Sequence, residues 1–101
     1  MDIIFANNKI RKACQNASGK LKRRLDDISA SEDMSMLELL PGRLHALREN
    51  KSGLWAMDLE HPLRLILEPV ANPLPLSKDG WLDLKKITAV KIIKVEDYHG
   101  K

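Results

Sequence analysis

The stretch that decides the fold runs from Leu44 to Leu67 and reads LHALRENKSGLWAMDLEHPLRLIL. Turn-forming residues interrupt this stretch twice, at positions 49–53 and again at 60–62. Around the two turns, apolar residues alternate with other residues in the period of a half-buried strand. We therefore predict three consecutive strands that form an antiparallel meander, with one face covered by helices and the other left open.

The third predicted strand contains one charged residue among its leucines, Arg64. Leu63, Leu65 and Leu67 share one face of this strand, so the alternation of side chains directs Arg64 to the other face. The leucine face is expected to pack on the core. Arg64 is therefore expected on the open face, where it can meet a ligand.

The residues before the meander predict one strand and two or three helices. Positions 2–6 form a short apolar run rich in strand-forming residues, and an asparagine pair that can cap a helix follows. From Ile10 to Ile28, apolar residues recur at spacings of three and four, as on the buried stripe of a helix, and Ser18-Gly19 divides this segment. A shorter helix is expected after residue 31 and ends at Pro41-Gly42.

The residues after the meander predict an irregular excursion and a final strand. Three prolines within positions 69–80 exclude regular structure there, and we expect Trp81 and its apolar neighbours to fix the return of the chain. Positions 88–95 are rich in strand-forming residues and predict the last long strand. The expected fold is α+β: residues 1–101 form a single domain, an antiparallel sheet with two or three N-terminal helices on one face.

The composition fits a small folded protein of mildly basic character. The chain has 101 residues, 44% of them hydrophobic, and a formal net charge of +3, which permits a nucleic-acid or acidic partner without requiring one. Only 4% of the residues are aromatic, so a stacking platform for single-stranded bases is not indicated. The single cysteine excludes an internal disulfide and fits a reducing cytoplasm, and we expect neither a signal peptide nor a membrane partner.

Four features carry groups capable of chemistry: His45, the pair Arg48 and Lys51, Arg64, and the terminal Asp97-Tyr98-His99. On one face of a sheet they would suit cleavage of RNA without a metal ion. An imidazole takes the proton from the 2′-hydroxyl, a guanidinium stabilises charge on the phosphorane, and a second imidazole protonates the leaving oxygen. Asp97 would orient one of the histidines.

Each of these residues also has a structural interpretation. A histidine in a strand is more often a half-exposed packing residue, and a strand arginine is usually solvated or paired with a cross-strand acid, here Asp58 or Glu68. Arg23 and Arg24 are most simply part of the exposed face of a helix, with a secondary role as RNA contacts.

Four segments taken together carry a family resemblance: Leu44-His45-Ala46-Leu47-Arg48, Gly53-Leu54-Trp55, Leu63-Arg64-Leu65-Ile66 and Glu96-Asp97-Tyr98-His99. In this order and spacing they resemble the HigB-type toxins of the RelE/ParE superfamily, from type II toxin–antitoxin systems. The resemblance covers nearly the whole chain. It implies a small RelE-like microbial RNase fold and a ribosome-dependent mRNA endoribonuclease that stops translation.

The resemblance also implies partners and roles. The expected partners are the ribosome with its mRNA and a cognate helix-turn-helix antitoxin of the HigA type, through which alone operator DNA is bound; no cofactor or metal is expected. The implied catalytic residues are His45, Arg64, Asp97, Tyr98 and His99, with RNA contacts from Arg48, Lys51, Arg23 and Arg24. Two alternatives remain: a non-nucleolytic toxin of the ParE kind, and an inactive antitoxin-binding module.

Overall fold

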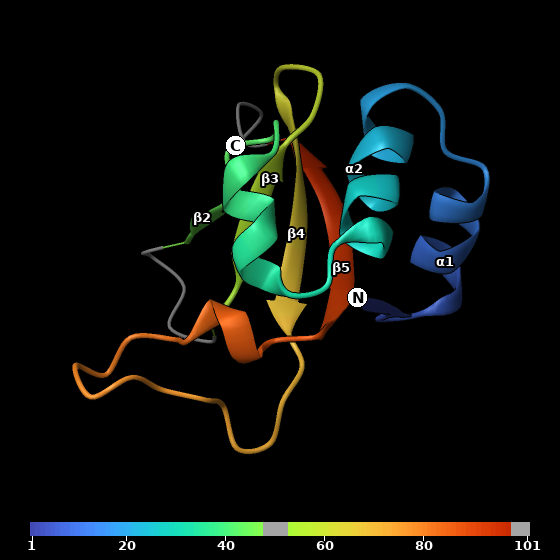
Figure 1. The fold of residues 1–101 in the computed structure, drawn as a ribbon. Helices are drawn as coiled ribbons and strands as arrows, with labels where there is room; N and C mark the ends of the chain where they lie inside the picture. The colour runs from blue at the N-terminus through green and yellow to red at the C-terminus, as the bar shows by residue number, and fades with distance from the viewer. Residues whose placement is uncertain (48–52, 98–101) are drawn as a thin grey trace.

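The computed structural model describes residues 1–47 and 53–97, and in these residues helices accompany a five-stranded mixed sheet (Figure 1). The α+β class predicted from the sequence is confirmed. The elements in chain order are β1 (Asp2–Phe5), α1 (Asn8–Gln15), α2 (Gly19–Ala30), the 3-10 helix η1 (Met34–Leu39), β2 (His45–Ala46), β3 (Trp55–Asp58), β4 (Leu63–Pro69), the 3-10 helix η2 (Leu84–Lys86) and β5 (Ala89–Asp97).

The sheet has the strand order β1-β5-β4-β3-β2. Strands β2, β3 and β4 pair consecutively and antiparallel, which confirms the predicted meander, and β5 joins β4 in the same sense. The prediction of a wholly antiparallel sheet is wrong at one edge, because β1 pairs with β5 in parallel. Since almost the whole chain separates these two strands, no hairpin imposes an antiparallel direction on them.

The N-terminal helical segment is capped and divided where the sequence predicts. Asn7 caps α1, its side-chain oxygen accepting a hydrogen bond from the backbone N–H of Ile10 at 2.9 Å. The segment divides before Gly19, whose φ of +61° is a conformation that favours glycine. Ser18 makes no side-chain cap for α2; instead Glu60 Oε2, from the β3–β4 turn, accepts a hydrogen bond from the Lys20 N–H at 3.1 Å. The third helix is a 3-10 helix, capped by Asp33.

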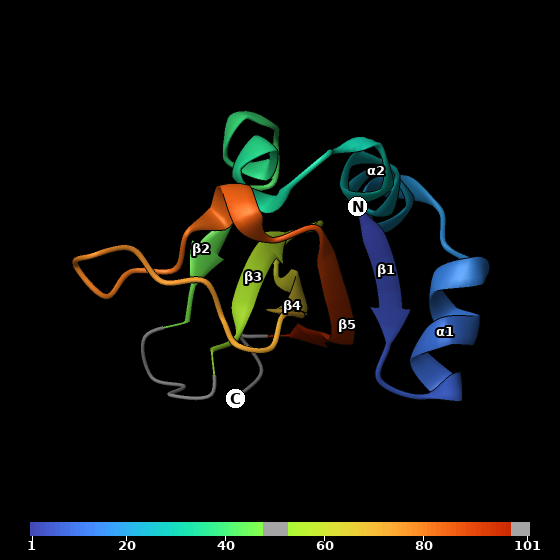
Figure 2. The same ribbon diagram turned by 60° about the horizontal axis from the view of Figure 1, so that its bottom comes forward.

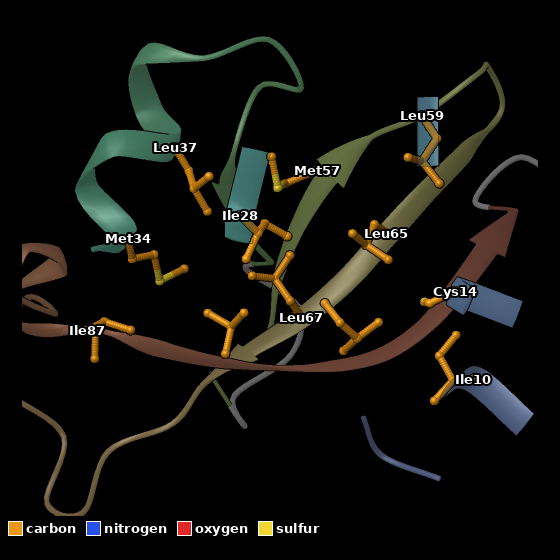
Figure 3. Packing of buried hydrophobic residues seen from close by; sticks show 12 residues of the cluster. Ile10, Cys14, Ile28, Met34, Leu37, Met57, Leu59, Leu65, Leu67 and Ile87 are labelled. Atoms are coloured by element: carbon orange, nitrogen blue, oxygen red, sulfur yellow. The ribbon is translucent and has the colours of Figure 1, made fainter. Parts of the chain in front are cut away.

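The core lies between the sheet and the helices. Figure 2 shows α2 and η1 on the same side of the sheet, with α1 alongside β1. The buried side chains come from every layer, as Figure 3 shows for Leu65 and Leu67 of β4, Met57 of β3, Ile28 of α2 and Leu37 of η1, all of which are 0% exposed. This packing fixes which face of β4 carries its leucines and so fixes the direction of Arg64.

The segment between β4 and η2 is the predicted excursion from the sheet. It carries one isolated bridge, between Leu76 and Leu82. The expected return of the chain is confirmed for the apolar neighbours of Trp81, because Leu82 and Leu84 pack against the core and Ile87 is 0% exposed. It is wrong for Trp81 itself, which is 76% exposed. Within the residues described, no helix has the length and apolar character needed to cross a bilayer.

Candidate functional site

The face of the sheet that carries Arg64 is the candidate site, and we call it the arginine face. Three charged residues stand in one row across adjacent strands: Asp58 of β3 is the register partner of Arg64 on β4, and Arg64 is the partner of Glu96 on β5. Register partners in an antiparallel pair point to the same face. The row therefore gathers one guanidinium between two carboxylates.

A second row on the same face consists of His45, Ala56, Ile66 and Lys94. The centre of this row is apolar and enclosed, since Ala56 is 0% and Ile66 1% exposed. The expectation of a fully open face is therefore wrong at its middle. The polar residues of this row, His45 and Lys94, lie at its two ends, with Ala56 and Ile66 between them.

A β-bulge in β5 determines which acid joins the site. Leu67 of β4 pairs with Ile92, but the preceding residue, Ile66, pairs with Lys94, so Ile93 is an extra residue in β5. The extra residue reverses the alternation. Glu96 consequently faces Arg64, whereas Asp97, the register partner of Leu63, belongs to the opposite face. The register therefore places Glu96, and not the predicted catalytic residue Asp97, beside Arg64.

Glu96 is held by two cations. Arg64 Nε donates a hydrogen bond to Glu96 Oε2 at 2.7 Å, and Arg64 Nη2 contacts the same oxygen. Lys94 Nζ lies 3.2 Å from the other carboxylate oxygen, Oε1. Partial burial acts to raise the pKa of Glu96, but the hydrogen bonds and charges of Arg64 and Lys94 outweigh it and hold this pKa below its ordinary value. Glu96 is thus ionised at neutral pH and forms ion pairs with Arg64 and Lys94.

Asp58 is held by two arginines, Arg43 and Arg24. Arg43 donates through Nε and Nη2 to the two carboxylate oxygens of Asp58, at 2.8 and 3.2 Å. The backbone of Asp58 is fixed as well, because its carbonyl accepts a hydrogen bond from Arg24 Nε at 3.1 Å. Positive and negative groups therefore alternate on this face, in the order Arg43, Asp58, Arg64, Glu96, Lys94, the last two both on β5.

His45 faces the same side as Arg64, because its register partner is Ala56, two residues before Asp58. Its Nδ1 lies 2.8 Å from the backbone carbonyl oxygen of Arg43. A carbonyl only accepts hydrogen bonds, so Nδ1 carries the proton in this contact and the neutral ring presents its lone pair at Nε2. With β3 between them, His45 and Arg64 are separated by roughly 12 Å of backbone, from the usual strand and residue spacings. The two residues thus share one face of the sheet, on strands that both pair with β3.

The two helix arginines lie in different environments. Arg23 is exposed on α2, near Glu60 in the β3–β4 turn. Arg24 is only 8% exposed, bound to the Asp58 carbonyl and 3.9 Å from Asp27. The prediction that Arg24 lies on the exposed face of the helix is wrong, and this side chain is not available to RNA. The remaining predicted residues, Arg48, Lys51, Tyr98 and His99, lie outside the described residues.

The structure adds four charged residues that sequence reasoning did not place in the site: Arg43, Asp58, Lys94 and Glu96. A signal for Glu96 was present, because the apolar residues Val90, Ile92 and Val95 break the period of two and so indicate a bulge. For Arg43 we find no comparable signal. Among the residues described, no group of three or more histidine, cysteine, aspartate or glutamate side chains could hold a metal ion.

Comparisons with protein-family models, with curated proteins and with solved structures find no match to this chain.

Proposed function

We propose that this chain is a HigB-type toxin, an endoribonuclease that cuts messenger RNA in the ribosomal decoding site and acts in the cytoplasm. The observation that supports this most is the shared face of His45 and Arg64. An imidazole can accept a proton, and a guanidinium offers a fixed positive charge to a phosphate. The four sequence segments that resemble this family supply the rest of the argument.

In the proposed reaction His45 Nε2 takes the proton of a ribose 2′-hydroxyl, and O2′ attacks the adjacent phosphorus. The O2′–P bond forms and the P–O5′ bond breaks, which leaves a 2′,3′-cyclic phosphate and a 5′-hydroxyl. His99 is assigned from the sequence as the acid that gives its proton to O5′, with Tyr98 beside it. Arg64 stabilises the charge that develops on the phosphorane oxygens.

The proposed partners follow from the same resemblance. They are the ribosome with its bound mRNA, and a helix-turn-helix antitoxin of the HigA type that neutralises the toxin and carries it to operator DNA. Arg48, Lys51 and Arg23 are the proposed additional RNA contacts. The most direct check of this arrangement is whether a small helix-turn-helix protein is encoded beside the chain.

The test is to induce the chain in a bacterium, measure protein synthesis and map mRNA 5′ ends. We expect arrest, with new 5′ ends confined to translated regions. His45→Ala and Arg64→Ala should each relieve the arrest and reduce cleavage about 100-fold or more, the usual scale for losing an acid–base or charge-stabilising group. Arg11→Ala, which removes an exposed guanidinium from α1, is the matched control and should arrest like wild type. Undiminished arrest and unchanged 5′ ends in both site variants would refute the proposal.

A second candidate is a non-nucleolytic toxin or antitoxin-binding module of the same superfamily. Two observations favour it: Arg64 is already bound by Glu96, and Asp97 faces away from Arg64. This candidate predicts either toxicity with DNA damage and intact mRNA, or tight antitoxin binding without growth arrest. The 5′-end map therefore separates it from the nuclease.

A further inference from the structure

The carboxylate of Glu96 binds two cations through different oxygens: Arg64 at Oε2 and Lys94 at Oε1. The Arg64 and Glu96 side chains are 22% and 25% exposed, whereas Lys94 is 57% exposed. The carboxylate thus has one partner inside the sheet face and one toward solvent. A small rotation of Glu96 toward Lys94 would release one partner without losing the other.

The chemistry of Arg64 makes this arrangement relevant to a nucleic acid. A guanidinium binds the oxygens of a carboxylate and those of a phosphate in the same planar geometry. The two anions therefore compete for the same N–H groups. A phosphate that takes the Nε and Nη2 edge of Arg64 must displace Glu96. A displaced carboxylate needs another cation nearby, because its charge is costly to leave unpaired.

We propose that Glu96 is a positioning residue that occupies the phosphate position on Arg64 in the free protein, and that an RNA phosphodiester displaces it onto Lys94. This inference rests on the proposed function, and it names the ligand group that this function requires at Arg64. Before RNA arrives, Glu96 keeps the guanidinium oriented across the arginine face. After RNA arrives, Lys94 retains the carboxylate, so no unpaired charge remains in the site.

The test measures binding, not cleavage, with an oligoribonucleotide whose riboses are all 2′-O-methylated. This probe has no 2′-hydroxyl nucleophile, so it cannot be cut, and binding remains measurable even if the chain is not a nuclease. Glu96→Gln keeps the shape of the side chain and removes the competing charge. We expect it to bind the probe roughly fivefold more tightly, the upper range for a partly exposed ion pair.

Glu68→Gln is the matched control. Glu68 also lies on β4, faces the same side as Arg64 by the alternation of the strand, and has Lys91 as its register partner. This variant changes the net charge equally but leaves Arg64 and Glu96 in contact, so it should tighten binding less than Glu96→Gln. Equal effects of the two variants, or weaker binding by Glu96→Gln, would overturn the proposal.

Three further measurements complete the test. In an Arg64→Ala background, Glu96→Gln should no longer tighten binding, because the two residues act through the same contact. Titration of the wild type with the probe should shift the NMR signal of the Arg64 Nε–H, which now donates to Glu96. Inorganic phosphate should compete with the probe. If the protein binds phosphate but not the probe, or if Arg64→Ala binds the probe as tightly as wild type, the proposed displacement of Glu96 by RNA is overturned. If the binding results hold while Arg64→Ala still arrests growth, the nuclease proposal fails and this one stands.

Discussion

Arg23 and Arg24 are neighbours in the chain but have different roles. Arg24 follows Leu21 by three residues and precedes Ile28 by four, so it lies on the apolar stripe of α2. Its aliphatic stem packs under Gly42, where an added Cβ would lie 2.7 Å from Arg24 Nε. The sequence therefore contained a signal for the burial of Arg24. The prediction that placed Arg24 on the charged face of the helix overlooked this signal.

The two arginines should differ in their effect on stability. Arg24→Ala removes the buried stem and leaves the Asp58 carbonyl without its donor, so we expect a loss of about 1–3 kcal/mol in the free energy of unfolding. Arg23→Ala, an exposed change on the same helix, should stay within about 0.5 kcal/mol of wild type. Urea denaturation of the two variants measures both values, and equal losses would contradict this account.

The ionisation of Glu96 should couple the stability of the protein to pH. Its pKa in the folded state is lower than the ordinary value of 4.5, so the folded state binds this proton less readily than the unfolded state does. The stabilisation by its ion pairs is present above pH 4.5 and is lost as the pH falls through the folded-state pKa. Glu96→Gln removes this dependence. Thermal unfolding from pH 6 to pH 3 should show a steeper fall in Tm for wild type than for the variant; parallel curves would count against the ion pairs.

Among the elements, the best predicted are those whose signals are local. The meander, the division of the helical segment before Gly19 and the direction of Arg64 all follow from turn residues and periodicity within short windows. The composition of the site was predicted less well, because it depends on which residues of β5 face β4. Because Ile93 is an extra residue in β5, Glu96 and not Asp97 is the register partner of Arg64. The pairing of Arg64 with a cross-strand acid, expected for Asp58 or Glu68, is seen with Glu96 of β5 for the same reason.

The junction between α1 and α2 gives a prediction about an element. At Gly19 a Cβ would lie 2.8 Å from Glu60 Oε2, the oxygen that caps α2, and the φ of +61° is already unfavourable for alanine. Gly19→Ala should therefore cost more than about 1 kcal/mol of stability. Gly80→Ala is the control, since Gly80 also has a positive φ, of +86°, but has nothing within 4 Å of its added Cβ. A cost at Gly19 no greater than that at Gly80 would argue against the cap.

For the whole molecule, stability should depend on the packing of β4 and not on the excursion that follows it. Leu65 is 0% exposed at the centre of the sheet, so Leu65→Ala should cost about 2–5 kcal/mol through lost burial and the cavity left behind. Trp81 is 76% exposed, and Trp81→Ala should change the free energy of unfolding by less than about 0.5 kcal/mol. Denaturant midpoints of the two variants test this division, and a large loss for Trp81→Ala would show that the excursion belongs to the core.

The parallel pair of β1 and β5 has a consequence for the order in which the chain folds. Asp2 pairs with Ala89, so this contact closes almost the longest loop available to the chain, whereas β3 and β4 meet across a short turn. Closing a loop of that length is slow, because its entropic cost arises before any stabilising contact has formed. We therefore expect the antiparallel strands to assemble first and β1 to dock last, so that β1 waits for its distant partner β5 before the sheet is finished.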